Sequence, residues 1–187
     1  MKIYEKCPFL ENEKFLLRMV ADEDCDDLLT VYSDKNALPF FNSDNCNDDI
    51  FYYNTKKKMM DAISFWRYSY DNQWFARLSI VEKTITKVIG TIELCYRVSE
   101  DAFNGMAILR LDVRSDYENE ATLRDIISLI VPQTYDLVKC TEIITKAPSY
   151  AIERISALQK FGFVKSEYLL KSGRDGYAFN GYWTIKK

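Results

Sequence analysis

Histidine is absent from this chain of 187 residues. Without an imidazole, the chain can form neither a Ser-His nor a Cys-His nucleophile pair, nor any zinc site that needs histidine. No stretch approaches about 18 consecutive apolar residues, which excludes a membrane-spanning helix. Residues 1–6 lead into no apolar run, so no secretory signal is visible. Internal repeats and Gly/Ser-rich linkers are also lacking, and we therefore expect one domain over residues 1–187.

The cysteines are five, an odd number, and no two of them form a Cys-x-x-Cys pair. This pattern argues against a disulfide framework and against a thiolate zinc site, so we expect no metal. It favours reduced, buried thiols in a cytoplasmic protein. The positions are Cys7, Cys25, Cys46, Cys95 and Cys140.

Charge of neither sign dominates, because 25 Lys and Arg residues stand against 28 Asp and Glu residues, a formal net charge of −3. The chain therefore has no general attraction to nucleic acid or to an anionic membrane, and we expect neither as a partner. Hydrophobic residues make up 48% and aromatic residues 14% of the chain. This composition supports a packed core, with rings left over for pocket walls.

The first half of the chain predicts one strand, two helices and three strands. Residues 15–20 form the first strand, and Asp22 or Asp24 then offers a cap for a helix with apolar residues at i, i+3, i+4 and i+7. A second helix is expected over residues 55–70. The strands expected next cover residues 74–81, 87–96 and 106–113, the first two joined as a hairpin.

The second half alternates helices and strands. A helix follows residues 115–120, and Pro132 is expected to kink or end it. A strand over residues 141–146 precedes a helix that begins near Pro148 and stops at Gly162. Two closing strands are expected over residues 163–170 and 177–186. The order β-α-α-β-β-β-α-β-α-β-β indicates an α/β fold with a mixed sheet.

Three stretches in this order resemble a known family. They are Phe15-Leu16-Leu17-Arg18-Met19-Val20-Ala21-Asp22-Glu23-Asp24, Val88-Ile89-Gly90-Thr91-Ile92-Glu93-Leu94 and Leu158-Gln159-Lys160-Phe161-Gly162-Phe163. Together they resemble the Gcn5-related N-acetyltransferase (GNAT) superfamily, most closely its ribosomal-protein-alanine acetyltransferase-like branch, over roughly residues 14–186. The resemblance implies a mixed, mostly antiparallel sheet of six to seven strands, with a central splay between two parallel strands and helices on both faces.

The resemblance also implies a cofactor, acetyl-coenzyme A (acetyl-CoA), lying in the splay between strands 106–113 and 141–146. Backbone N–H groups at a helix N-terminus would hold its pyrophosphate. By alignment with the family's motif, the loop would be residues 118–123. The cofactor contacts implied in this way are Leu111, Val113, Arg114, Asn119, Glu120, Ala121, Thr122, Leu123, Ala151 and Arg154.

The loop departs from the family's glycine-rich pattern. Ala121 and Leu123 stand where the family has small residues, and Leu123 is expected to add bulk where the pyrophosphate approaches. Glu118 and Glu120 add two negative charges, each costing about 2–3 kcal/mol at about 6 Å and a dielectric of about 20 if it faces the ligand. If they turn outward, they only stabilise the helix N-terminus. Arg114 and Arg124 are either phosphate contacts or surface residues.

Glu93 is the first candidate for the general base of acetyl transfer, because it lies on an otherwise unpolar strand face. If that face is covered, the pKa of Glu93 should rise toward a useful range. The alternative is an exposed glutamate paired with a lysine. Tyr96 is a candidate proton donor to the leaving thiolate, and Tyr117 is either a second donor or a packing residue. Cys95 is expected to be a structural thiol.

Aromatic residues between 40 and 70 are expected either to line the acceptor pocket or to belong to the core. The pocket candidates are Phe40, Phe41, Tyr52 and Trp66, with Phe51, Tyr53 and Tyr68 beside them. Asp44, Asp48 and Asp49 would suit a cationic amine, or they form a solvated loop.

Two functions remain open from the sequence. One is transfer of an acetyl group from acetyl-CoA to a primary amine, on a protein N-terminus or a small molecule. The other is a degenerate member of the fold that binds a peptide, protein or other small ligand without acetyl transfer. An open splay with free N–H groups from Ala121 to Leu123 would favour the first, and a filled gap the second. A homodimer is compatible with either.

Overall fold

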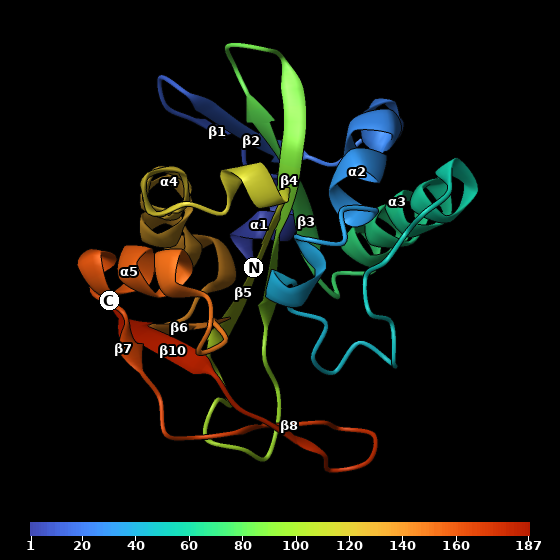
Figure 1. Ribbon diagram of the computed structural model, residues 1–187. Coiled ribbons are helices and arrows are strands. Elements are labelled where there is room, and N and C mark those ends of the chain that lie inside the picture. Colours follow the sequence, from blue (N-terminus) through green and yellow to red (C-terminus); the bar gives the residue numbers. More distant parts are fainter.

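A sheet of eight strands runs through the protein, and helices cover both of its faces (Figure 1). The computed structural model describes residues 1–187. In spatial order the strands are β1 (Leu10–Glu11), β2 (Phe15–Met19), β3 (Ala76–Glu82), β4 (Lys87–Tyr96), β5 (Ala107–Val113), β6 (Glu142–Lys146), β10 (Tyr182–Lys186) and β7 (Val164–Lys165). The helices are α1 (Lys2–Glu5), α2 (Cys25–Tyr32), α3 (Lys56–Asp71), α4 (Glu120–Val138) and α5 (Ile152–Phe161). Single 3-10 turns cover Asp22–Asp24, Leu38–Phe40 and Ser115–Tyr117.

One pair of neighbouring strands, β5 and β6, is parallel, and every other pair in the sheet is antiparallel. The parallel pairing is limited to Ala107 with Ile143 and Ile108 with Ile144. β5 continues to Val113 and β6 to Lys146 without further partners on these edges, so the strands diverge. The α/β fold class and the splay expected from the resemblance are thus confirmed, in a sheet of eight strands where six to seven were expected.

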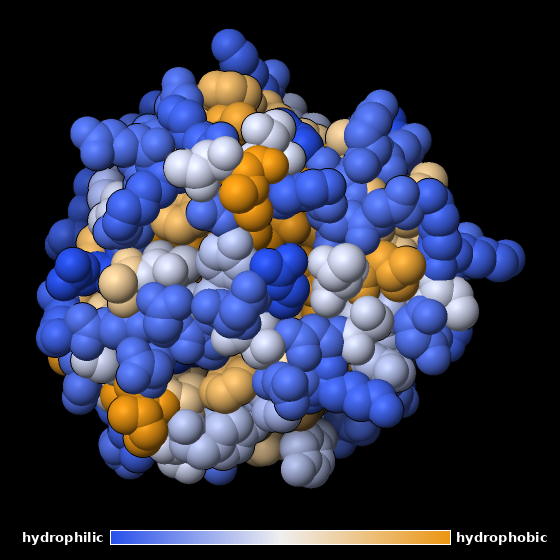
Figure 2. Space-filling model, turned by 45° about the horizontal axis from the view of Figure 1, so that its top comes forward, coloured by the Kyte–Doolittle hydropathy of each residue, from blue (hydrophilic) through white to orange (hydrophobic).

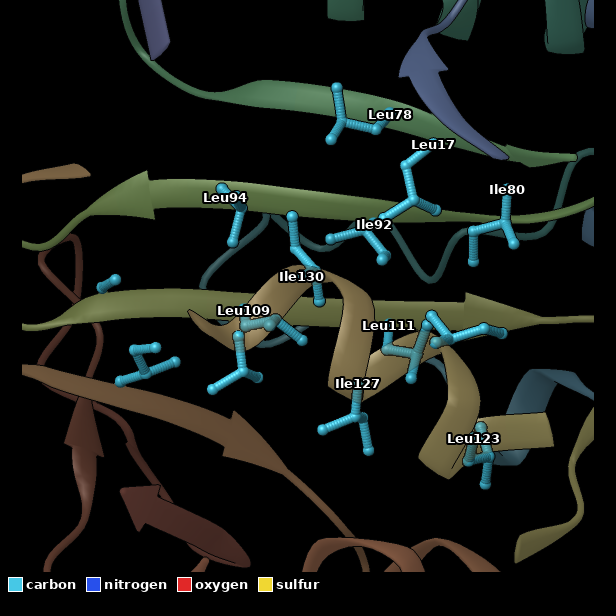
Figure 3. Close-up of a cluster of buried hydrophobic side chains, with 14 of the residues drawn as sticks. Leu17, Leu78, Ile80, Ile92, Leu94, Leu109, Leu111, Leu123, Ile127 and Ile130 are labelled. Atoms are coloured by element: carbon cyan, nitrogen blue, oxygen red, sulfur yellow. The ribbon is translucent and has the colours of Figure 1, made fainter. Parts of the chain in front are cut away.

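The two faces of the sheet carry separate cores. α4 and α5 cover one face, where Leu123, Ile127 and Ile130 pack on strand residues such as Leu109 and Leu111 (Figure 3). α2 and α3 cover the other face. Figure 2 shows a mostly hydrophilic surface broken by small hydrophobic patches. None of the helices is both long and apolar enough to cross a membrane.

Pro132 was expected to kink or end this helix, and the structure shows that α4 does not end there but runs on to Val138. Proline lacks the N–H that would bind the carbonyl of Ser128, so the helix loses one hydrogen bond. Thr134, Tyr135 and Val138 beyond it are buried. Packing of this last turn against the core holds the helix together past the proline.

The two closing strands are each broken. Residues 163–170 contribute only β7 and β8 (Leu170–Lys171), and residues 177–186 contribute β9 (Ala178–Phe179) and β10. Gly181 has φ +83°, a left-handed conformation that interrupts the strand between β9 and β10. β8 and β9 form a separate two-stranded sheet. α1 and β1 were not expected, because each is too short to show a periodic pattern of apolar residues in the sequence.

Of the two cap candidates for α2, Asp24 stands at the N-cap position, but its side chain makes no capping hydrogen bond to the helix N-terminus. Asp24 instead binds Arg18, Ser79 and the N–H of Ala21. Its carboxylate therefore joins the helix to β2 and β3.

Candidate functional site

The N-terminus of α4 is occupied by side chains of the protein itself. The Asn119 side chain accepts from the N–H of Thr122 at 3.1 Å, and its carbonyl accepts from the N–H of Leu123 at 3.0 Å. The N–H of Glu120 donates to the carboxylate of Glu153, from the first turn of α5, at 2.9 Å. An internal carboxylate thus takes the place that a phosphate would need.

A buried ion pair lies next to the N-terminus of α4. Arg154 on α5 holds both oxygens of Glu118, at 2.7 and 2.6 Å, and both side chains are almost fully buried. Burial by itself lowers the pKa of Arg154, but Glu118 outweighs it and raises that pKa, so the guanidinium stays charged. It also donates to the carbonyls of Leu111, at 2.8 Å, and Phe40, at 3.2 Å.

The position of Leu111 shows that Arg154 bonds the open edge of β5 in the splay. Leu111 lies on β5 beyond its last pair with β6, so its carbonyl belongs to the edge that the splay leaves open. The Leu38–Phe40 turn closes over this point. The Tyr150 hydroxyl donates to the carbonyl of Pro39 at 2.7 Å, and its ring packs on Phe40 at 5.9 Å. Arg154 and the Leu38–Phe40 turn therefore occupy the edge of β5 in the splay. A cavity of about 680 Å³ remains beside them at the end of β6, where Phe41, Lys146 and Tyr150 are among the lining residues.

The loop residues correct one expectation and resolve another. Leu123 has no exposed surface and packs into the core (Figure 3), so it adds no bulk at the phosphate position. Glu120 binds Ser156 at 2.6 Å and Lys160 at 2.7 Å, both on α5. Both loop glutamates therefore fasten α4 to α5.

Acetyl-CoA does not fit these residues in the position that the resemblance implies. Its pyrophosphate needs free N–H groups, but the N–H of Glu120 is already bonded to the Glu153 carboxylate, and the Arg154-bound Glu118 and the Lys160-bound Glu120 stand beside it. The edge of β5 is already bonded to Arg154.

The remaining implied cofactor contacts have structural roles here. Val113 and Ala151 are buried. Arg114 forks onto Asp116 at 2.7 and 2.8 Å, and Arg124 lies on the surface with its nitrogen 4.0 Å from Glu120. The Tyr117 hydroxyl donates to Glu82, which favours the packing alternative.

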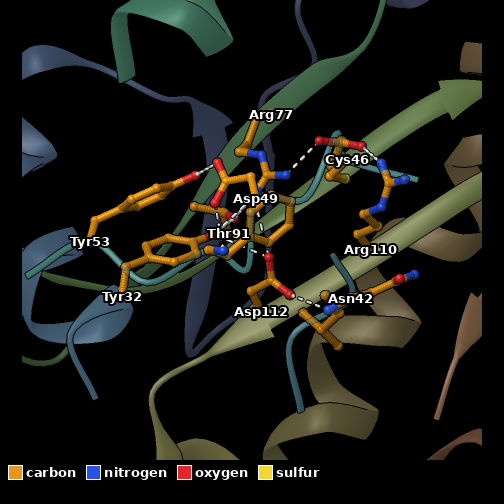
Figure 4. A network of polar contacts seen from close by, with 12 residues as sticks. Tyr32, Asn42, Cys46, Asp49, Tyr53, Arg77, Thr91, Arg110 and Asp112 are labelled. Carbon is orange, nitrogen blue, oxygen red and sulfur yellow. Dashed lines mark hydrogen bonds and ion pairs between the residues drawn. The ribbon is translucent and has the colours of Figure 1, made fainter. Parts of the chain in front are cut away.

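A second candidate site lies on the opposite face of the sheet, where three charged residues stand side by side. Arg77 on β3 is directly opposite Glu93 on β4, and Glu93 is directly opposite Arg110 on β5. Glu93 binds Arg77 with one oxygen and Arg110 with the other. Arg77 also donates to the Tyr32 hydroxyl at 2.9 Å and to Asp112 at 3.3 Å (Figure 4).

This network reverses the expected pKa of Glu93. Burial alone raises the pKa, but Arg110 and Arg77 outweigh it and lower it below the ordinary value. Glu93 is neither an exposed residue paired with lysine nor a carboxylate with a raised pKa, and it is poorly suited to accept a proton. The pKa of Asp112 is raised instead, chiefly by burial.

A cavity of about 330 Å³ opens beside these residues. Its wall is aromatic: Phe51, Tyr53, Phe65, Trp66, Trp74, Phe75 and Tyr96 line it. The Arg77 guanidinium carbon lies 4.4 Å from the Trp66 ring and 5.1 Å from the Phe51 ring, as in a cation–π contact. Trp74 and Phe65 remain about half exposed, at 54% and 52%. The remaining lining residues are Asn45, Cys46, Asn47, Asp49, Arg77, Glu93, Cys95, Arg97, Val98, Ile108 and Arg110.

The predicted site residues divide between three places. Glu93, Tyr96 and Trp66 line the aromatic cavity. Tyr52 lines a shallow neighbouring pocket. Phe41 packs on Tyr32 with ring centroids 5.1 Å apart, away from the cavity.

The three acidic candidates also differ. Asp44 is bound by Lys146 and Tyr182, and Asp48 by Arg174. Asp49 alone has no cation partner. Of the expected acidic set, one residue therefore remains at the cavity for a ligand.

Sequence reasoning missed Arg77, Arg110 and Glu153. A signal for the first was present, because pairing of the expected hairpin strands puts Arg77 across from Glu93. Arg110 stands in an apolar run, Ile108-Leu109-Arg110-Leu111, which marks a buried charge. Glu153 gave no signal, since an acidic residue in the first turn of a helix is ordinary.

No family model and no curated protein matches the sequence, but solved structures match the fold. Ribosomal-protein-S5-alanine acetyltransferase from Vibrio fischeri superposes with a TM-score of 0.68 at 15% identity, over 96% of each chain. Spermidine N-acetyltransferase from Vibrio cholerae, in complex with CoA and spermine, gives 0.64 at 10% identity, over 94% of this chain and 96% of that one. RimJ from Mycobacterium smegmatis, in complex with CoA-disulfide, gives 0.69 at 15% identity, over 96% and 86%. The fold is that of the GNAT acetyltransferases, as the resemblance implied.

Proposed function

We propose that this protein uses the acetyltransferase fold as a binding scaffold and does not take acetyl-CoA in the manner of the enzymes it resembles in fold. The observation that carries the proposal is the Arg154–Glu118 pair in the splay, with Glu153 on the N-terminus of α4. The ligand site is the aromatic cavity on the other face of the sheet.

The free energy needed to displace Arg154 and Glu153 from the splay supports this proposal. To admit the pantetheine arm, Arg154 would have to leave Glu118 and the carbonyls of Leu111 and Phe40. Separating a buried ion pair costs about 3–5 kcal/mol, because one charge stays buried without a partner. The pyrophosphate would also have to displace Glu153 and lie near two further carboxylates. Of the two arginines considered as phosphate contacts, Arg114 is bound to Asp116 and Arg124 lies on the surface, 4.0 Å from Glu120.

The cavity has the features of a small-molecule site. Its volume of about 330 Å³ is within the range of about 300–1,000 Å³ usual for such pockets. It combines an aromatic wall with a few polar groups on rigid strands, and such a combination fixes the orientation of a ligand.

Acetyl transfer to a primary amine is the second candidate. It is supported by the fold, by the CoA present in two of the similar structures, and by Asp49, which has no cation partner at the cavity. It requires that Arg154 and Glu153 move away when the cofactor arrives.

Calorimetric titration of the full chain with acetyl-CoA, with CoA as control, separates the two candidates. We expect no binding up to millimolar ligand, at low or moderate salt. Micromolar binding would overturn the scaffold proposal and justify a screen of amine substrates.

A further inference from the structure

The arginines in the lining of the aromatic cavity are already neutralised by carboxylates. The pairs are Arg77 with Glu93 and Asp112, Arg110 with Glu93, and Arg97 with Asp101. Three guanidinium groups therefore meet three carboxylates, and their charges cancel. One charged lining residue is left, Asp49, which has no cation partner. The cavity thus carries an excess of negative charge, and its field favours a cation.

The Asp49 carboxylate is accessible and held in place. Asp49 is exposed, and it accepts the N–H of Phe51 and the hydroxyl of Tyr53, both at 2.7 Å (Figure 4). Asp49, Tyr53 and Phe65 also line a neighbouring pocket of about 390 Å³. The carboxylate therefore lies beside two aromatic rings, where a ligand can reach it.

Two rings of the lining present free faces. Trp74 and Phe65 are about half exposed, and each makes a T-shaped contact with another ring, Tyr68 at 5.5 Å and Phe75 at 6.0 Å between ring centroids. A T-shaped contact covers at most one face of each ring and restricts the motion of both. Because the face of an aromatic ring carries partial negative charge, it attracts a cation that comes within about 6 Å. The wall of the cavity therefore offers a surface for a cation.

Among cations, the lining favours a methylated ammonium over a primary one. A primary ammonium is strongly hydrated and needs acceptors for its N–H groups. The two carboxylates of the lining are already in use, because Glu93 is bound by Arg77 and Arg110 and each Asp49 oxygen accepts one hydrogen bond. A quaternary ammonium has no N–H group, and its methyl groups pack on ring faces. It needs only a nearby negative charge and aromatic surface, and the cavity provides both.

We propose that the aromatic cavity binds a small organic cation with a quaternary, methylated ammonium group, whose charge lies beside Asp49 and whose methyl groups contact Trp74 and Phe65. This inference rests on the proposed function, because it takes the cavity as the ligand site of a binding scaffold. It also distinguishes the ligand from an acceptor of acetyl transfer, since a quaternary nitrogen has no lone pair with which to attack a thioester.

Calorimetry with matched probes at neutral pH tests the ligand class. Choline is compared with its neutral carbon analogue, 3,3-dimethyl-1-butanol, and with its primary amine analogue, ethanolamine. Benzyltrimethylammonium and benzylamine repeat the second comparison on a larger body. We expect at least one quaternary cation to bind at or below millimolar concentration, and at least tenfold tighter than its analogues. A smaller preference, or no binding of either quaternary cation at millimolar concentration, would overturn the proposal.

Two variants of exposed residues locate the binding. Asp49→Asn removes the charge but keeps the shape of the side chain, and it should weaken binding of the quaternary cation at least fivefold. Trp74→Ala removes a ring face and should also weaken it at least fivefold, with Trp74→Phe in between. Both residues are exposed, so these variants leave the core intact. A smaller loss in Asp49→Asn or Trp74→Ala would overturn the assignment.

Glu13→Gln and Phe9→Ala are the matched controls. Glu13 is an exposed carboxylate and Phe9 an exposed ring, and neither lines the cavity. Both control variants should leave the affinity unchanged. A control that loses as much affinity as its partner variant would show that the cation does not bind in the cavity.

The acetyl-CoA titration separates this inference from the proposed function. If neither acetyl-CoA nor any of the cations binds, the ligand class is wrong and the scaffold proposal stands. If acetyl-CoA binds at micromolar concentration, the scaffold proposal fails, and with it the inference that rests on it.

Discussion

Glu153 accepts a hydrogen bond of 2.9 Å from the backbone N–H of Glu120, so the first turn of α5 supplies the anion at the N-terminus of α4. Next to it, Arg154 binds Glu118 and the open edge of β5. Two consecutive residues of one helix thus bond the N–H of Glu120 and the carbonyl of Leu111. Because the Glu153 carboxylate serves as the anion at the N-terminus of α4, the fold needs no external anion there.

Breaking the Arg154–Glu118 pair from one side should be costly. Arg154→Met leaves Glu118 buried and unpaired, and we expect a loss of about 3–5 kcal/mol in the free energy of unfolding. The double variant Glu118→Gln/Arg154→Met should recover most of that loss, because no charge remains buried. Urea unfolding measures both variants.

The exposed Arg174–Asp48 pair is the control for the Arg154→Met measurement. Both of its side chains are more than half exposed, so Arg174→Ala should cost no more than about 1 kcal/mol. Equal losses in Arg154→Met and Arg174→Ala would show that the pair in the splay contributes no more than a surface contact.

Removing the internal anions should open the splay to a cofactor. In Glu118→Gln/Glu153→Gln/Arg154→Ala, the N–H of Glu120 loses its charged acceptor and Leu111 loses its donor. We expect acetyl-CoA affinity to increase at least tenfold over the original chain, measured by calorimetry. Glu167→Gln, a change of one exposed carboxylate elsewhere, is the matched control for net charge. An affinity increase equal to that of the control would contradict the role assigned to the three residues.

Acid should destabilise the protein partly through Glu93. Its pKa in the folded state lies below the ordinary value, chiefly because Arg110 and Arg77 overcome the effect of burial. Its stabilising contribution is therefore complete above about pH 4.3, the unfolded pKa, and is lost as pH falls through the folded pKa. Glu93→Gln should show a shallower fall in unfolding free energy below about pH 4.3, by up to about 1.4 kcal/mol per pH unit. Identical slopes in both proteins would exclude this contribution.

The cysteines of the cavity should react slowly. Burial raises the pKa of Cys46 to about 11 and that of Cys95 to about 12, so thiolate is scarce at pH 8. We expect alkylation of both by iodoacetamide at pH 8 to be at least tenfold slower in the folded chain than in urea, followed by mass spectrometry. Folded-state rates equal to those in urea would contradict the raised pKa values.

The local sequence pattern predicted most helices and strands correctly. It failed where tertiary packing or a turn sets the end of an element. The apolar stripe of α4 predicted that helix. Pro132 suggested a kink or an end, and burial of Thr134 and Val138 keeps the helix from ending there. Conversely, residues 163–170 have strand composition but pair only at their two ends. The free energy by which a single residue favours a helix end or a strand is small, and the free energy of tertiary contacts exceeds it.

The sequence by itself determined the order of most elements, because hydrophobic period and turn residues are local properties, and the resemblance of three stretches to a known family implied the acetyltransferase-like fold. It also predicted that Ala121 and Leu123 replace the loop glycines of the family and that Glu118 and Glu120 add negative charge beside them. Only the tertiary structure decided where those charges point, that Arg154 and Glu153 occupy part of the splay, and that two arginines lower the pKa of Glu93. The partners in these contacts lie 16 to 36 residues apart, and their pairing depends on strand register and on the packing of α5 against α4, which no local pattern records.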